Sequence, residues 1–134
     1  SWRDDLKAAN AGKPVDVIVD PVGGEATEPA FRSLAWNGRH LVIGFAGGSI
    51  PRLPVNLALL KGASLIGVDV RQFGDYEHAL AEANVQALLA LFAQGKLYPP
   101  IARTYPIDDF VAAMEEAQRG VTAGRIVITM AAPQ

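Results

Sequence analysis

The chain has 134 residues with a formal net charge of -2, and half of its residues are apolar. This length supports a compact core, and the composition excludes a disordered polyelectrolyte and gives no sign of the clustered basic surface that nucleic acids require. The apolar runs are far shorter than the ~20 residues that span a bilayer, and the amino-terminal sequence has no secretory signal pattern. No cysteine is present, which excludes disulfides and thiolate metal sites. We therefore expect a cytoplasmic protein without a membrane or nucleic-acid partner.

The first 70 residues alternate between helical and strand patterns. Ser1 and Asp4 have the form of a capping box, and Trp2, Leu6 and Ala9 then share one helical face. The elements predicted after this helix are a strand at Val15–Asp20, a helix at Glu25–Ala35 closed by Asn37-Gly38, a strand at Arg39–Phe45, a short helical turn late in Ser49–Lys61, and a strand at Ala63–Val70.

The remaining residues predict a long helix, a strand, a helix and a strand. The long helix covers Tyr76–Phe92 and ends near Gly95, and strands are predicted at Ile101–Tyr105 and Gly124–Met130. Between these strands an amphipathic helix is predicted, with an apolar stripe of Ile107, Phe110, Val111, Met114 and Ala117. Its acidic pairs, Asp108-Asp109 and Glu115-Glu116, are interpreted as helix-end and solvent-face charges.

Strands separated by helices predict an α/β fold with a parallel sheet, so the first 70 residues look like one half of a doubly wound sheet. In such sheets the ligand lies beyond the carboxyl ends of the strands, where the strand order reverses. A sheet that begins at Val15 has only one side of that point. Its first strand would also show an unpaired apolar edge.

Three segments follow the predicted strands and are candidates for ligand contact: Asp20–Gly24, Gly44–Gly48 and Val68–Arg71. Their glycines either satisfy turn geometry or let a flat ligand approach the backbone, and recurrence at successive strand ends favours a ligand cleft. A phosphate cradle is not visible, because neither the spaced-glycine dinucleotide fingerprint nor a Gly-Lys-Ser/Thr loop occurs.

Side chains typical of catalysis are sparse. His40 lies inside a predicted strand and His78 on the long helix, and neither has a partner near it in sequence, so both are interpreted as packed or solvated histidines. No serine lies in a nucleophile elbow. Arg119 and Arg125 bracket Gly120–Gly124, and either anion binding or simple solvation accounts for them. We therefore assign no catalytic and no metal-binding residue.

The ordered set of segments resembles the carboxyl-terminal half of medium-chain dehydrogenase/reductases, specifically the zinc-free, zeta-crystallin-like NADPH:quinone oxidoreductase branch. The matching segments are VDVIVDPVGG, then AFRSLAWNGRHLVIGFAGGSIPRLPVNLALLKGASLIGVDV, and finally ALLALFAQGKLYPPIARTYPIDDFVAAMEEAQRGVTAGRIVI. The resemblance implies that residues 1–70 are the second half of an NAD(P)-binding Rossmann domain. Residues 71–134 would be the carboxyl-terminal helix-strand-helix-strand part of the catalytic domain.

The resemblance also implies a cofactor, a reaction and a set of contacts. The cofactor is NADPH, and the reaction is hydride transfer to a quinone or an activated alkene such as an enone. The implied cofactor-binding residues are Val22, Gly23, Gly24, Leu41, Val42, Ile43, Gly44, Phe45, Ala46, Ile66, Gly67, Val68 and Arg125, the last at a position where the family more often has Lys.

The amino-terminal half of this family has no counterpart in the chain. We therefore expect a part of a longer reductase that is inactive alone and binds nucleotide weakly. Two alternatives stay open. One is a fragment of a Rossmann-like methyltransferase, which the LAWNGRHLVIG segment also resembles. The other is a non-catalytic dimerisation module, in which Ser64–Val70 and Ile50–Val55 form a homo-oligomeric contact through the last Rossmann strand.

Overall fold

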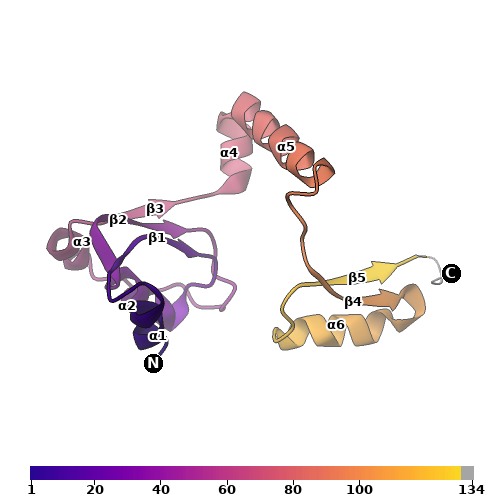
Figure 1. The fold of residues 1–134 in the computed structure, drawn as a ribbon, viewed down its shortest axis with the longest axis horizontal. Helices are drawn as coiled ribbons and strands as arrows, with labels where there is room; N and C mark the ends of the chain where they lie inside the picture. Colours follow the sequence, from indigo (N-terminus) through magenta and orange to yellow (C-terminus); the bar gives the residue numbers. More distant parts are fainter. Residues whose placement is uncertain (131–134) are drawn as a thin grey trace. The chain divides into compact units, whose positions relative to one another are not determined.

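The chain divides into two compact units, Ser1–His78 and Ala79–Gln134, and a computed structural model describes residues 1–130 (Figure 1). The boundary between the units, after His78, lies eight residues beyond the boundary at 70/71 expected from the sequence. The assignment of these parts to a Rossmann and a catalytic domain stays a prediction. The last four residues of the chain, 131–134, lie outside the described residues.

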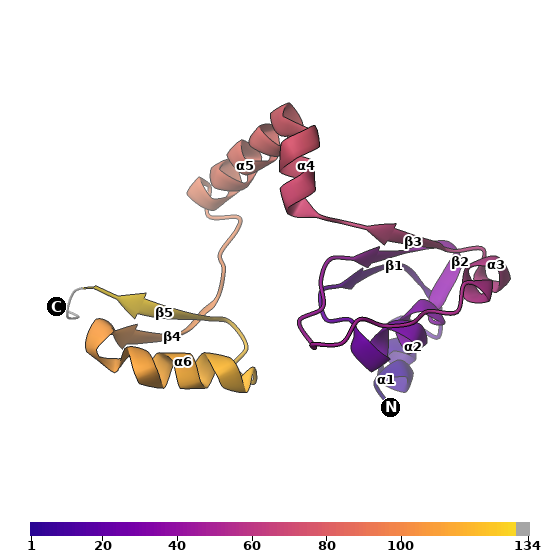
Figure 2. The ribbon, with the colours of Figure 1, turned by 180° about the vertical axis from the view of Figure 1, so that it is seen from behind.

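Three parallel strands form the sheet of the first unit, in the order β1-β2-β3 (Figures 1 and 2). They are β1 (Val15–Asp20), β2 (Leu34–Val42) and β3 (Ser64–Gly67). The helices of this unit are α1 (Trp2–Ala9), η1 (Gly24–Ala26), α2 (Thr27–Phe31), α3 (Asn56–Lys61) and α4 (Val70–Tyr76). The parallel α/β architecture predicted from the sequence is confirmed, and the capping box of α1 is present.

The core of the first unit lies on one face of this sheet. Phe31 and Leu34 are fully buried, Leu57 is nearly so, and Ile18 packs against them. This arrangement follows from the alternation of side chains along β1, because Val17 and Val19 point to the other face and are 40% and 60% exposed. As expected, β1 is an edge strand of the described sheet and carries apolar side chains.

Several element boundaries differ from the predicted ones. The helix predicted at Glu25–Ala35 is confined to η1 and α2, and β2 begins at Leu34 and ends at Val42 instead of Phe45. Asn37 and Gly38 do not close a helix; they lie within β2, where the register with β1 shifts between Val15↔Leu34 and Val17↔Arg39. Asn37 has a φ of 60°, a conformation that Asn tolerates better than most residues. The last predicted strand residue, Val70, begins α4 instead.

The second unit contains a parallel pair of strands and a helix that packs against both. Its elements are β4 (Ile101–Pro106), η2 (Ile107–Asp109), α6 (Phe110–Arg119) and β5 (Arg125–Thr129), and α5 (His78–Ala93) begins at the boundary between the units. Gly95 has a φ of 68° just after α5, as its predicted place at the helix end requires. No helix in residues 1–130 is long and apolar enough to cross a membrane.

Glu116 on α6 corrects one interpretation of the acidic pairs, because its side chain is buried and not on a solvent face. It accepts hydrogen bonds from Tyr105 Oη, from Arg103 at 3.0 Å and from the Thr122 hydroxyl at 2.7 Å. The Tyr105 and Thr122 bonds lower the pKa of Glu116 against the opposing effect of burial, and the positive charge of Arg103 adds to them. Glu116 therefore ties α6 to β4 and to the loop before β5.

Candidate functional site

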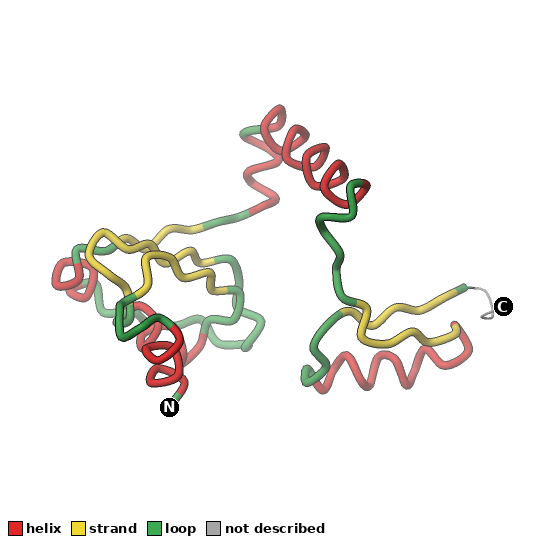
Figure 3. Tube along the Cα trace, in the orientation of Figure 1, coloured by secondary structure: helices red, strands yellow, loops and turns green. Residues whose placement is uncertain are grey.

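The segments that leave β1 and β2 continue side by side beyond the carboxyl ends of the strands (Figure 3). The Ile43 N–H donates to the Asp20 carbonyl at 2.9 Å, and the Ala46 N–H donates to the Pro21 carbonyl at 3.0 Å. Gly47 then donates to the Val22 carbonyl at 2.9 Å. These two exit loops, residues 21–24 and 43–49, therefore form one hydrogen-bonded rim at the carboxyl edge of the sheet.

The glycines in this rim are required by contacts within the chain. Gly23 is buried with φ 70° and ψ -148°, and a Cβ atom there would lie 2.7 Å from Cδ1 of Phe45. A Cβ on Gly47 would lie 3.0 Å from the carbonyl oxygen of Val22, and Gly24 donates its N–H to Ser49. The glycines thus allow the two exit loops to pack closely against each other.

Asp20 lies at the end of β1, and its carboxylate receives four hydrogen bonds. Oδ1 accepts from the N–H groups of Val22 at 3.1 Å and Gly23 at 2.8 Å. Oδ2 accepts from the Thr27 hydroxyl at 2.8 Å and from Nε2 of His40 at 2.9 Å. Burial alone raises the pKa of this carboxyl, but the four donors outweigh burial and lower the pKa to about 2.

His40 is fully buried on β2, on the face that packs against α2. Its ring stacks on Phe31 with a centroid distance of 5.9 Å. In the register of the sheet His40 pairs with Ile18, so Asp20 is its diagonal neighbour on the same face. Because Nε2 faces a carboxylate, that nitrogen carries a proton, and Nδ1 is buried without a hydrogen-bond partner among the described residues.

The structure brings twelve of the thirteen sequence-predicted contact residues to one edge of the first unit. Val22–Gly24 and the segment from Leu41 to Ala46 share the rim, and Ile66–Val68 join it because β3 pairs with β2 and the Val68 N–H donates to the Val42 carbonyl at 2.9 Å. The side chains of Val22, Ile43, Phe45, Ile66 and Val68 are each 37–49% exposed. This edge is therefore a half-exposed apolar ledge bordered by backbone polar groups.

Arg125, the remaining predicted contact residue, is the first residue of β5 in the second unit. Its backbone N–H donates to the Pro100 carbonyl at 2.7 Å, which fixes the start of β5 beside β4. Together with Glu116, Thr122 and Gly124 it lines a surface pocket of about 360 Å³.

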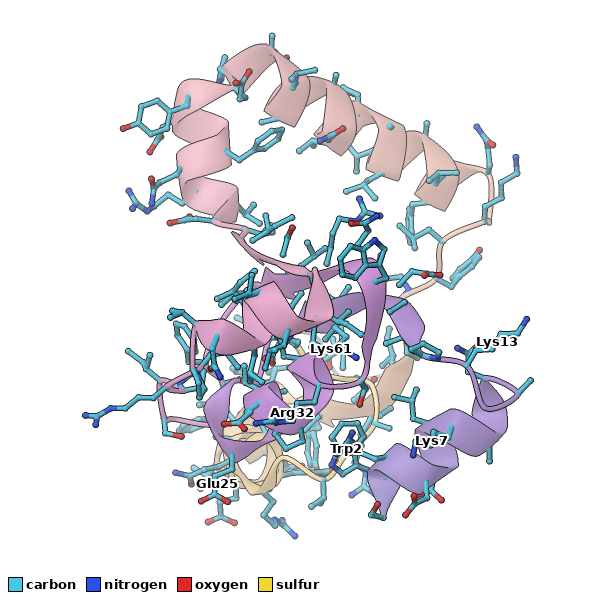
Figure 4. All side chains as sticks on the ribbon, turned by 90° about the vertical axis from the view of Figure 1, so that its left-hand side faces the viewer. Trp2, Lys7, Lys13, Glu25, Arg32 and Lys61 are labelled. Carbon is cyan, nitrogen blue, oxygen red and sulfur yellow. The ribbon has the colours of Figure 1, made fainter. Side chains whose placement is uncertain are left out.

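A second pocket, of about 460 Å³, opens beside Gly24. Glu25 and Glu28 line it together with Arg52, and Glu28 is engaged by Arg32, whose Nη2 lies 2.7 Å from the carboxylate. Figure 4 labels Glu25 and Arg32. Arg32 and Arg52 together only balance the two carboxylates, so the pocket has no excess of positive charge to attract a pyrophosphate group.

Sequence reasoning missed the link between Asp20 and His40. Asp20 was predicted as the last residue of a strand and the first of an exit segment, and His40 was interpreted as an ordinary packed or solvated histidine. The signal that was present is an acidic residue at the end of one strand and a histidine inside the next parallel strand. The register that makes them diagonal neighbours depends on the shift at Asn37-Gly38, which the sequence did not reveal.

A family model described as zinc-binding dehydrogenase matches residues 2–128, which is almost the whole chain. The chain belongs to the zinc-binding dehydrogenase family. It is thus a member of an oxidoreductase family within the medium-chain dehydrogenase/reductases, which the sequence resemblance had indicated. This membership removes the reason for the methyltransferase alternative.

Relatives of this dehydrogenase family include quinone oxidoreductase-like protein 2 of Mus musculus, which is 31% identical over 133 residues. That match covers 97% of this chain but 37% of the mouse protein, so the chain spans about a third of the length of the relatives it matches. A crystal structure described as a "probable oxidoreductase" from Mycobacterium abscessus is 34% identical, with a TM-score of 0.71 over 96% of this chain and 37% of that one.

A further solved structure, a mycobacterial protein complexed with NADPH, shares the fold at 19% identity with a TM-score of 0.73. The match covers 95% of this chain and 39% of that chain.

Zinc ligation, to which the family's description refers, does not fit the described residues. In residues 1–130 no group of three or more His, Asp or Glu side chains lies close enough to hold a metal ion, and the chain has no cysteine. The chemistry proposed below for this chain therefore includes no step at zinc.

Proposed function

We propose that this chain is the carboxyl-terminal part of an NADPH-dependent reductase that transfers hydride to a quinone or an activated alkene. The observation that carries the proposal is the apolar ledge at the carboxyl edge of β1, β2 and β3, together with membership of an oxidoreductase family. In parallel α/β sheets a nucleotide cofactor binds beyond this edge.

The ledge suits the nicotinamide end of the cofactor. Val22, Ile43 and Val68 offer half-exposed apolar surface for one face of a flat ring. Gly67 leaves open space, because a Cβ atom there would meet nothing within 4 Å. The bound cofactor supplies the hydride, and the ledge contributes orientation and the exclusion of water. No described side chain is assigned as an acid or a base, so the proton that completes the reduction comes from solvent or from residues outside this chain.

The diphosphate end of the cofactor does not fit the same residues. Glu25 lies beside Gly24 and would repel it, and the glycines of the exit loops are in close contact with the neighbouring exit loop. We therefore assign the pyrophosphate and the 2′-phosphate to the longer protein, with Arg125 as the one cationic contact proposed from this chain. It follows that the chain alone binds nucleotide weakly and is inactive.

A homo-oligomer through β3 belongs to the same proposal. In the described sheet β3 is an edge strand, and Leu65 and Ile66 are 50% and 38% exposed. An edge strand with apolar side chains is a surface that a second copy can extend. Size exclusion at increasing concentration tests this contact, and a strictly monomeric longer protein would argue against it.

The activity is tested with the longer protein and a panel of acceptors. We expect oxidation of NADPH, followed at its absorbance near 340 nm, with at least one quinone or enone, and no turnover by the 134-residue chain alone. The control is the same assay with NADH, which measures the preference for NADPH over NADH. Absence of turnover with every quinone and enone tested would count against the proposed reaction. Tight saturable binding of NADPH by the chain alone would contradict the assignment of the pyrophosphate and 2′-phosphate contacts to the rest of the longer protein.

A further inference from the structure

The turn after β1 is held from inside the protein by one carboxylate. Asp20 Oδ1 binds the N–H groups of Val22 and Gly23, which are consecutive in the turn. The side chain of Asp20 is 12% exposed, and its bond to the buried Gly23 is better shielded from water than its bond to the half-exposed Val22. If the carboxylate moves, both N–H groups lose their acceptor, and the Val22–Gly24 segment keeps only its backbone bonds to the other exit loop.

The position of this carboxylate is fixed in turn through its other oxygen. Oδ2 accepts from Thr27 at the start of α2 and from His40 on β2. Thr27 and His40 are 2% and 0% exposed. Asp20 thus joins the turn, α2 and β2 at a single point below the apolar ledge.

His40 is an unusual residue for such a buried position. Its ring packs on Phe31 like an apolar side chain, yet its Nδ1 is buried without a partner among residues 1–130. A leucine would fill this place without burying an unpartnered nitrogen, but it would remove the donor to Asp20. The hydrogen bond from Nε2 to Asp20 is therefore the interaction of His40 that an apolar residue could not make.

We propose that Asp20 and His40 are positioning residues for the nicotinamide cofactor, acting through the Val22–Gly24 turn and touching neither cofactor nor substrate. This inference rests on the proposed function, because it takes the turn to be one wall of the nicotinamide site. The side chains of Asp20 and His40 lie behind the turn, where a substitution does not reach the cofactor directly. Their effect is expected on the affinity for NADPH and not on the chemical step once the cofactor is bound.

The kinetic test compares His40→Leu, His40→Gln and Asp20→Asn in the longer protein. Gln keeps an N–H donor in place of Nε2, whereas Leu keeps only bulk. We expect His40→Leu and Asp20→Asn to raise the KM for NADPH about tenfold with kcat within about twofold, and His40→Gln to recover most of the loss. The matched control is Asp16→Asn, an exposed carboxylate on the same strand, which should leave KM unchanged. An unchanged KM in His40→Leu, or equal losses in His40→Leu and His40→Gln, would overturn the assignment.

A second measurement uses the unsubstituted 134-residue chain and depends on neither turnover nor the folding of a variant. In NMR spectra recorded while the pH is lowered, the Val22 and Gly23 amide resonances should shift together with the Asp20 carboxyl resonance, since both N–H groups bond to it. Amide resonances that do not follow Asp20 would overturn the hydrogen-bonded turn itself. If the longer protein reduces no acceptor while the amides follow Asp20, the proposed function fails and the turn geometry stands.

Discussion

Replacing Gly23 with Ala is expected to destabilise the first unit by about 3 kcal/mol, through backbone strain and overpacking together. Gly23 has φ 70° and ψ -148°, a region that is essentially restricted to glycine, and its Cβ would lie 2.7 Å from the ring of Phe45. Relief of that contact requires the Phe45 ring or its loop to shift. Urea unfolding followed by tryptophan fluorescence measures the change, because Trp2 and Trp36 both lie in the first unit.

Two other glycines provide matched controls for this substitution. Gly48 also has a positive φ, of 87°, but a Cβ there would meet nothing within 4 Å, so Gly48→Ala should cost only about 1 kcal/mol of backbone strain. Gly67 has open space and no positive φ, and Gly67→Ala should change stability by less than about 0.5 kcal/mol. Equal losses for Gly23→Ala and Gly48→Ala would show that loop packing plays no part.

Acid should remove the stabilisation that ionised Asp20 provides. The pKa of Asp20 is lowered from 3.8 to about 2 in the folded protein. A depressed folded-state pKa contributes stability that is fully present above the unfolded value near 3.8 and is lost as the pH falls toward 2. The shift corresponds to about 2 kcal/mol of unfolding free energy at neutral pH. The cause is the set of four donors around the carboxylate.

The measurement compares the unfolding free energy of the unsubstituted chain and of Asp20→Asn from pH 7 to pH 2, again by tryptophan fluorescence. The difference between the two proteins should be largest at neutral pH and shrink through the window between about 4 and 2. Asp16→Asn, which removes an exposed carboxylate from the same strand, serves as the control. A pH-independent difference for Asp20→Asn would mean that the carboxylate is not stabilised by its donors.

The parallel order of the elements was predictable from sequence, because β-branched runs alternate with helical patterns and with Gly-rich exits. The strand Val15–Asp20 was predicted with its observed bounds, since Pro21 and the following glycines end it clearly. The end of β2 was not, because Ile43 and Phe45 continue its apolar pattern although their backbone already belongs to the exit loop. Apolar composition alone does not distinguish a strand from a loop that pairs with a neighbouring loop.

Features that depend on register or on tertiary contact were not predictable. The Asp20–His40 bond requires the register shift at Asn37-Gly38, and the burial of Glu116 requires the donors of Arg103, Tyr105 and Thr122 to converge on it. The glycines of the exit loops were interpreted either as turn residues or as positions where a ligand approaches the backbone. Which group approaches them, a ligand or the neighbouring loop, is a tertiary fact that residue type does not carry.

A crystal structure of the longer protein with NADPH bound is the most direct test of the central claim. We expect the nicotinamide ring to lie against the apolar ledge, in contact with the Val22–Gly24 turn, the loop after β2 and the Ile66–Val68 segment. We also expect the pyrophosphate to lie away from Glu25 and Glu28. A cofactor bound with its nicotinamide ring away from the carboxyl ends of β1, β2 and β3 would contradict the proposed function.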